Sequence, residues 1–303
     1  EFAPASADAS FRRYFRVSHG ADTWVVMDAP PEREDCRPFL HVAQLMLDAG
    51  LNGPRVIAQD LVQGFLLLSD LGRQTFLHVL NADNADALFS AAITALVQWQ
   101  QASRADVLPP YDEALLAREL ALFPDWYVAK HLGRTFTPQQ QAWWDEACRL
   151  LIVRALAQPK VFVHRDYMPR NLMISEPNPG VLDFQDAVYG PVSYDVVSLF
   201  KDAFASWPAM RVQGWRRQYW DAARTADLPI TADYADFCRD FDLMGLQRHL
   251  KVLGIFARIN YRDGKSHYLA DTPRFIRYVR EVVDGDAELE PLKQLFDSLD
   301  LHA

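Results

Sequence analysis

The stretch that most constrains how this chain can fold spans residues 160–186 and reads KVFVHRDYMPRNLMISEPNPGVLDFQD. It contains three short runs of β-branched, aromatic and aliphatic residues, at 161–163, 172–174 and 181–182. The turn-forming sequence Pro-Asn-Pro-Gly leads into the third run. Because charged and amide residues follow these runs, we expect their side chains to lie on short loops where strands end.

The polar residues of this stretch have a specific spacing. His164-Arg165-Asp166, four further residues and Asn171 reproduce the catalytic-loop pattern of protein kinases, and Asp183-Phe184 reproduces the metal-binding pair. In such a loop Asp166 orients an acceptor hydroxyl and accepts its proton, while Asn171 and Asp183 offer the oxygen ligands that Mg²⁺ prefers. A chance polar hairpin would have to match six positions, so we favour a phosphotransferase that uses ATP and Mg²⁺.

The loop and four other segments, SADASFRRYFRV, VVMDAPPE, FLLLSDLG and VLDFQDAVYGPVSYDVVSL, together resemble the aminoglycoside phosphotransferase/choline kinase family. That family shares the protein-kinase fold and acts on small molecules. More narrowly, the segments are similar to the bacterial anomeric sugar kinases that phosphorylate N-acetylmuramate and N-acetylglucosamine in cell-wall recycling. The resemblance runs from about Ser6 to Val283. It implies an α+β fold with two lobes, a β-rich nucleotide-binding lobe with one helix over residues 1–71 and a mainly helical lobe over residues 72–303.

The first lobe is expected to begin with two antiparallel strands at 11–17 and 23–27. The resemblance implies that residues 6–16 cover the ATP phosphates, with Ser10, Arg12 or Arg13 as donors. A surface hairpin with solvated arginines is the alternative. The third kinase strand normally carries a phosphate-binding lysine, and the sequence VVMD at 25–28 has none. Arg13 and Arg16 are our candidates to replace it.

The rest of this lobe is predicted to hold a helix at 35–49 and strands at 55–59 and 64–69. Glu32 and Glu34, near the start of this helix, are either partners of a phosphate-binding cation or exposed carboxylates that stabilise the helix dipole, and we prefer the second interpretation. Residues 67–72 resemble the hinge that binds adenine, with Leu68 and Asp70 as cofactor contacts. A buried edge strand explains the leucines equally well.

Long helical patterns follow at 83–103, 111–132 and 138–157, and residues 209–299 are also helical. Trp126 follows a proline that interrupts the second pattern, and it either stacks on the acceptor or belongs to the core. Arg170, inside the catalytic loop, is expected to contact the acceptor or the transferring phosphate. Gln185 is also expected to contact the acceptor substrate.

The helix predicted at 240–261 combines an apolar stripe with basic residues. Arg248 is our candidate for holding a substrate carboxylate, although a solvated charged face is the preferred interpretation of these residues. Asp195 resembles the family's aspartate that braces the catalytic loop. Only eleven residues separate Asp183 from Asp195, which leaves no room for a peptide-binding activation segment. The acceptor is therefore expected to be small.

Charge and cysteine content exclude other classes. The formal net charge of −9 argues against a nucleic-acid partner. Three distant cysteines suggest neither zinc nor disulfides and fit a reducing cytoplasm. No run is apolar enough to span a membrane, and we expect a cytoplasmic monomer. The alternatives are an aminoglycoside, choline or homoserine kinase of the same fold, or a non-catalytic pseudokinase that acts as a binding module.

Overall fold

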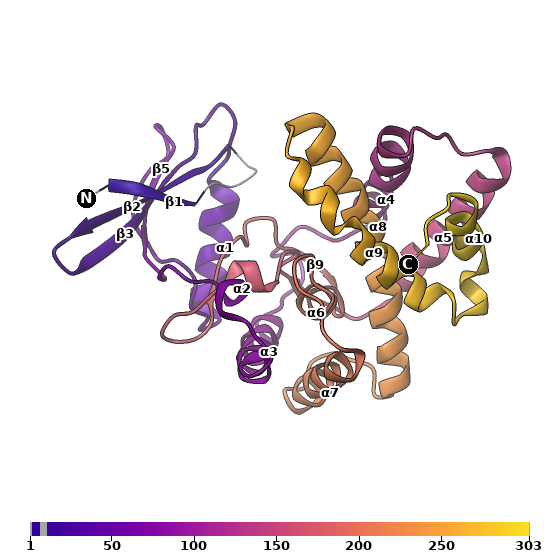
Figure 1. Cartoon of the computed structure of the whole chain (residues 1–303). Coiled ribbons are helices and arrows are strands. Elements are labelled where there is room, and N and C mark those ends of the chain that lie inside the picture. The colour runs from indigo at the N-terminus through magenta and orange to yellow at the C-terminus, as the bar shows by residue number, and fades with distance from the viewer. Residues whose placement is uncertain (1, 7–10, 303) are drawn as a thin grey trace. The chain divides into compact units, whose positions relative to one another are not determined.

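The computed structural model describes residues 2–6 and 11–302 (Figure 1). It divides into two compact units. The first consists of Glu1–Ser103 with His164–Ala187, and the second of Arg104–Val163 with Val188–Ala303. Of the residues described, none belongs to a helix that is both long and apolar enough to cross a bilayer.

The first unit contains a five-stranded antiparallel sheet with the strand order β1-β2-β3-β5-β4. Its strands are β1 (Phe2–Ser6), β2 (Arg13–His19), β3 (Asp22–Asp28), β4 (Val56–Asp60) and β5 (Phe65–Ser69). Gly20 adopts a φ of 60°, which the tight turn between β2 and β3 requires and which glycine adopts without strain. The expected strands are confirmed; β1 was not predicted.

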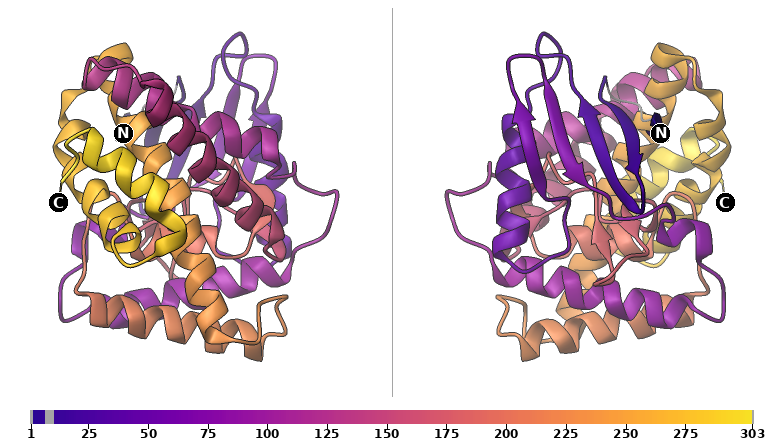
Figure 2. Two further views of the ribbon diagram at one scale, coloured as in Figure 1. Left: turned by 90° about the vertical axis from the view of Figure 1, so that its right-hand side faces the viewer. Right: turned by 90° about the vertical axis from the view of Figure 1, so that its left-hand side faces the viewer.

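One helix, α1 (Arg37–Asp48), runs beside the sheet (Figure 2). Phe39, Val42 and Met46 recur at helical spacing and are buried, which explains why this amphipathic segment folds as a helix. The helix starts after Glu34, and Glu34 forms an ion pair with Arg12 at 3.0 Å. The interpretation of Glu34 as an exposed carboxylate in the first helical turn is therefore wrong.

The first unit also contains α2 (Phe76–Val79), α3 (Ala85–Gln101) and the segment that carries the kinase-like pattern. That segment forms a 3₁₀ turn at Pro169–Asn171 and a short hairpin of β7 (Leu172–Met173) and β8 (Gly180–Val181). The buried hydroxyl of Tyr167 donates to the carbonyl of Ala92 in α3, at 2.8 Å. The loop is thus attached to a helix of the same unit.

The second unit is mainly helical, with one two-stranded sheet. Its elements are α4 (Glu113–Leu120), a π-helix at Phe123–His131, α5 (Pro138–Ala157), β6 (Lys160–Val163), β9 (Val188–Pro191), α6 (Tyr194–Phe200), α7 (Ala209–Thr225), α8 (Tyr234–Asp263), a 3₁₀ helix at Ser266–Asp271, α9 (Thr272–Val283), a 3₁₀ turn at Ala287–Leu289 and α10 (Glu290–Ser298). The helical pattern expected over 111–132 is interrupted: α4 ends at Leu120, and a π-helix with Pro124 in its first turn follows, where the missing N–H of proline is tolerated.

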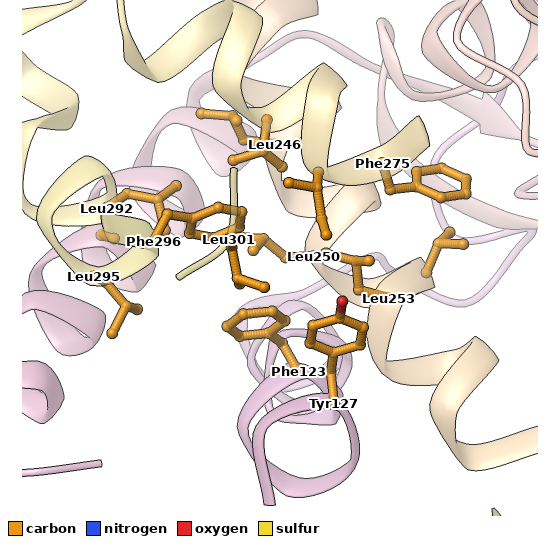
Figure 3. Packing of buried hydrophobic residues seen from close by; sticks show 14 of the residues in the cluster. Phe123, Tyr127, Leu246, Leu250, Leu253, Phe275, Leu292, Leu295, Phe296 and Leu301 are labelled. Atoms are coloured by element: carbon orange, nitrogen blue, oxygen red, sulfur yellow. The ribbon is translucent and has the colours of Figure 1, made fainter. Parts of the chain in front are cut away.

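The core of the second unit lies where the π-helix, α8, α9 and α10 meet. Figure 3 shows Phe123 and Tyr127 packed toward Leu250 and Leu253, with Phe296 nearby. The Phe123 and Phe296 rings stack with centroids 5.8 Å apart. At one point the backbones meet directly: a Cβ added to Gly254 in α8 would lie 2.3 Å from the carbonyl carbon of Leu122. Only glycine permits this approach.

Candidate active site

A cleft within the first unit brings the strand face, the hinge and the catalytic loop together. The sheet contributes Tyr14, Arg16, Val25 and Leu68; the chain after β5 contributes Ser69–Arg73, Thr75 and His78; the catalytic segment contributes Arg170, Asn171, Met173, Leu182, Asp183 and Phe184. The strand residues share a face because Arg16 is opposite Val25 and Val25 is opposite Leu68. Three predicted cofactor residues, Arg16, Leu68 and Asp70, therefore line one cleft with both predicted metal ligands, whereas Arg12 and Arg13 are not among its lining residues.

His164 connects the two loops that carry the predicted catalytic groups. Its side chain is buried, its Nδ1 accepts from the N–H of Asp166 at 3.2 Å, and its Nε2 lies 3.0 Å from the carbonyl oxygen of Leu182. These partners require the neutral tautomer with the proton on Nε2. Burial lowers the pKa of His164 to about 4, so the ring stays neutral at pH 7.

Asn171 is buried and links the main chain of Asp166 to the carboxylate of Asp183. Its Nδ2 donates to the main-chain oxygen of Asp166 at 2.9 Å and to Oδ2 of Asp183 at 3.3 Å. Since the amide nitrogen has these partners, the Oδ1 atom is the one that can serve as an acceptor or a cation ligand. The predicted metal ligands thus lie together.

Asp183 occupies an unusual backbone conformation, with a φ of 64°. Non-glycine residues in the left-handed region are uncommon, and they concentrate at functional sites where the surroundings hold them. Gln185, two residues on, donates from Nε2 to Oδ1 of Asp183 at 3.0 Å. Gln185 therefore contacts a predicted metal ligand; its assignment to the acceptor stays a prediction.

The hinge is fixed to β2 by Arg16. This arginine donates to both carboxylate oxygens of Asp70 and, at 2.6 Å, to the carbonyl of Gly72. Burial acts to raise the pKa of Asp70, but the bonds from Arg16 and from the N–H of Gly72 outweigh it, so that pKa is lowered. The pKa of Arg16 is raised, chiefly by its bond to Asp70. Arg16 is engaged with the hinge.

Arg13, the other candidate for the missing lysine, and Arg12, a predicted phosphate donor, also have ion-pair partners. Met27, in the strand that carries the lysine in kinases, is completely buried. The Arg13 side chain is 65% exposed and pairs with Asp28. The side chains of Arg12 and Glu34 are only 12% and 14% exposed, and their ion pair is the more enclosed of the two. Ser10 lies outside the described residues.

Two predicted substrate residues belong to the second unit. Trp126 is half-buried and packs against the hydrophobic core. Arg248 is 2% exposed, and His249 and Lys251 beside it are buried as well. The preferred interpretation of these basic residues as a solvated face is therefore wrong, because α8 crosses the middle of the helical unit and is covered on most sides.

Sequence reasoning missed several residues of the cleft. Tyr14 shares the face of Arg16 two positions away, and strand alternation alone would have found it. Thr75 and His78 line the cleft as the capping box of α2, with Thr75 Oγ1 2.9 Å from His78 Nδ1. A four-residue helix leaves no periodic signal, so these two positions were not foreseen.

Comparisons with known proteins agree with this geometry. The chain is 60% identical over 299 residues to an N-acetylmuramate/N-acetylglucosamine kinase from Pseudomonas aeruginosa. The aligned region covers 99% of this chain and 88% of the relative. A choline kinase from Streptococcus pneumoniae has a similar structure, with a TM-score of 0.67, 10% identity and 93% of each chain covered. An ADP-bound aminoglycoside phosphotransferase matches with a TM-score of 0.60 and 14% identity, over 93% of this chain and 94% of the other.

The structural similarities confirm the expected protein-kinase-like fold, with a small antiparallel sheet and a larger helical part. A family model described as "Phosphotransferase enzyme family" matches residues 1–234. The resemblance drawn from the sequence is thereby confirmed, and the chain is an enzyme that belongs to the phosphotransferase enzyme family.

Proposed function

We propose that the enzyme transfers the γ-phosphoryl group of ATP to the anomeric hydroxyl of N-acetylmuramate and N-acetylglucosamine. The relative with 60% identity is named N-acetylmuramate/N-acetylglucosamine kinase, which supports the two sugars as acceptors. The observation that carries the proposal is the hydrogen-bonded set of Asp166, Asn171 and Asp183 in one unit with the cleft. An intact set of this kind favours a working kinase over a pseudokinase.

The reaction is assigned to the residues of the catalytic loop. The carboxylate of Asp166 orients the anomeric hydroxyl and accepts its proton as the new oxygen–phosphorus bond forms and ADP leaves. An anomeric hydroxyl is more acidic than an ordinary alcohol, so a carboxylate of ordinary basicity is sufficient. Arg170 lines the cleft next to Asn171 and is assigned to the transferring phosphate, where its fork matches phosphate oxygens.

The oxygen ligands of Asn171 and Asp183 suit Mg²⁺ better than a metal whose ligands all come from protein side chains. Among residues 2–6 and 11–302 no group of three or more His, Cys, Asp or Glu side chains is arranged to hold a metal ion. Asn171 and Asp183 offer one amide oxygen and one carboxylate, which suits a cation that takes its remaining ligands from phosphates and water. Bound there, Mg²⁺ neutralises the charge of the phosphoryl group.

The nucleotide is assigned to the sheet side of the cleft. Leu68 and Val25 supply an apolar surface for adenine, and the hinge around Asp70 supplies backbone groups. Arg16 keeps that hinge in place through Asp70. For the phosphates we favour Arg12, because Glu34 holds it as the kinase glutamate holds its lysine. Ser10 and Arg13 are assigned to the same phosphate-covering segment.

The acceptor is assigned to Gln185, Trp126 and Arg248, and the enzyme is proposed to be a cytoplasmic monomer. Phosphorus NMR with Mg·ATP and each sugar tests the reaction. A doublet from an anomeric phosphate on both amino sugars is the expected result. Product with kanamycin or choline and none with the amino sugars would contradict the substrate assignment while keeping the mechanism. Asp166→Asn serves as the matched inactive control.

A further inference from the structure

Three neighbouring polar side chains in the second unit are buried, and each has atoms without a hydrogen-bond partner. They are Asp202 just after α6, and Arg248 and His249 in α8, with exposed fractions of 1%, 2% and 2%. The unpartnered atoms are Oδ2 of Asp202, Nη1 of Arg248 and both ring nitrogens of His249. Buried polar atoms are bonded in the great majority of cases, so three adjacent exceptions need an explanation.

Asp202 and Arg248 are close enough to interact but do not pair. Burial raises the pKa of Asp202 to about 6, and the charges of Arg248 and Arg274 oppose that rise. Oδ1 of Asp202 accepts from the N–H of Ala203 at 2.6 Å. Oδ2 of Asp202 therefore offers an acceptor and Nη1 of Arg248 offers a donor, and neither atom has a hydrogen-bond partner.

His249 follows Arg248 in α8 and contacts two aromatic rings. Its ring centroid lies 5.1 Å from that of Tyr278 and 5.5 Å from that of Phe275 in α9. Burial lowers its pKa well below the ordinary value, and the positive charges of Arg248 and Lys201 act in the same direction. The ring is therefore neutral, with one donor and one acceptor nitrogen.

Two basic side chains near this cluster, Lys201 and Arg274, have ion-pair partners of their own. Lys201 pairs with Glu281 at 2.6 Å, and Arg274 pairs with Asp271 at 3.0 Å and donates to the carbonyl of Ala203. Ser206 is exposed and shares a hydrogen bond of 2.8 Å with the hydroxyl of Tyr278, whose ring lies beside His249. The unpartnered atoms thus comprise donors and acceptors with no excess of positive charge.

We propose that Asp202, Arg248 and His249 form the subsite for the acceptor sugar and bind the hydroxyl or acetamido groups that N-acetylmuramate and N-acetylglucosamine share. This inference rests on the proposed function. A hydroxyl or an amide donates and accepts at once, as the three side chains require. A substrate carboxylate would satisfy Arg248 but would lie close to the negative charge of Asp202, so the structure favours a neutral group over the lactyl carboxylate.

The test uses Arg248→Met and Asp202→Asn, with Arg280→Met as the matched control. Arg280 is 6% exposed, and its partners are Asp297 at 2.6 Å and the carbonyl of Leu301 at 2.7 Å. We expect KM for both sugars to rise about tenfold or more in the first two variants, by similar factors, with KM for ATP unchanged. Arg280→Met should lower Tm and leave both KM values as they are.

Thermal-shift titration provides a reading independent of turnover. Wild-type protein should be stabilised by either sugar and by Mg·ATP, and the two variants should keep only the stabilisation by Mg·ATP. Unchanged KM values for the sugars in both variants would overturn the proposed subsite. A rise in KM confined to N-acetylmuramate would overturn it as well. If wild-type protein phosphorylates neither sugar, the proposed function fails; the subsite then stands only if sugars stabilise the wild type and not the variants.

Discussion

Arg16 in β2 and Asp70 in the hinge form a bidentate ion pair, with Nε and Nη2 of the arginine 2.5 and 2.9 Å from the two carboxylate oxygens. The side chains are only 12% and 5% exposed. A pair so enclosed fixes the hinge more firmly than a surface ion pair, because water competes little for either partner. The hinge therefore has a defined position before any nucleotide arrives.

Breaking that pair should affect both stability and nucleotide binding. We expect Arg16→Met to lower the free energy of unfolding by about 2 kcal/mol, since Asp70 would be left without its main partner. KM for ATP should rise while KM for the sugar stays the same. Arg13→Met is the control: its arginine is 65% exposed, and its loss should cost less than about 1 kcal/mol. Equal losses of stability in the two variants would contradict the structural role of Arg16.

Asp166→Asn and Asp183→Asn should each abolish transfer in a folded protein. Asp166→Asn removes the proton acceptor, which contributes about 10²–10⁴-fold to the rate. Asp183→Asn removes the carboxylate ligand of the cation. An ADP-release assay measures turnover, and circular dichroism with Tm checks folding. Substantial turnover by either folded variant would refute the assigned roles.

The buried His164 should make stability depend on pH. Its pKa is about 4 in the folded protein and near 6.5 when unfolded, so the unfolded chain binds more protons between these values. Wild-type protein should therefore lose stability as the pH falls from 6.5 to 4, by about 3 kcal/mol from this group alone. Urea titrations across that range should show a weaker pH dependence for His164→Asn, because the same other groups titrate in both proteins. Parallel pH profiles would refute the linkage.

Two helical glycines provide a matched test of packing. Gly254→Ala would place a methyl carbon against the backbone of Leu122, and overpacking of this kind should cost about 3 kcal/mol or more. Gly214→Ala in α7 meets nothing within 4 Å and should stabilise by about 0.5–1 kcal/mol, because alanine is the better helix former. Urea denaturation measures both. An unchanged free energy of unfolding in Gly254→Ala would mean that α8 can shift away from the π-helix.

Much of the fold was predictable because its signals are local. The strands β2 to β5 follow from β-branched runs bounded by turns, and α1 follows from Phe39, Val42 and Met46 at helical spacing. The catalytic set was predictable because Asp166 and Asn171 lie on one short loop with a fixed interval. Asp183 follows one hairpin later.

The partners of the arginines were not predictable, because they depend on strand register and on chain segments far apart. Arg16 and Asp70 are 54 residues apart, and no local pattern marks them as a pair. Arg248 was misjudged for a related reason. An amphipathic pattern is ambiguous for a helix that is covered on most sides, and in α8 charged residues are buried along with leucines.

The chain passes from one compact unit to the other three times, after Ser103, after Val163 and after Ala187. Consequently, truncation at Ser103 would separate residues 164–187 from the unit to which they belong. A chimera that exchanges the second unit for that of a relative needs two inserted pieces rather than one fusion point. Exchanging 104–163 and 188–303 together is the smallest change that keeps the first unit whole.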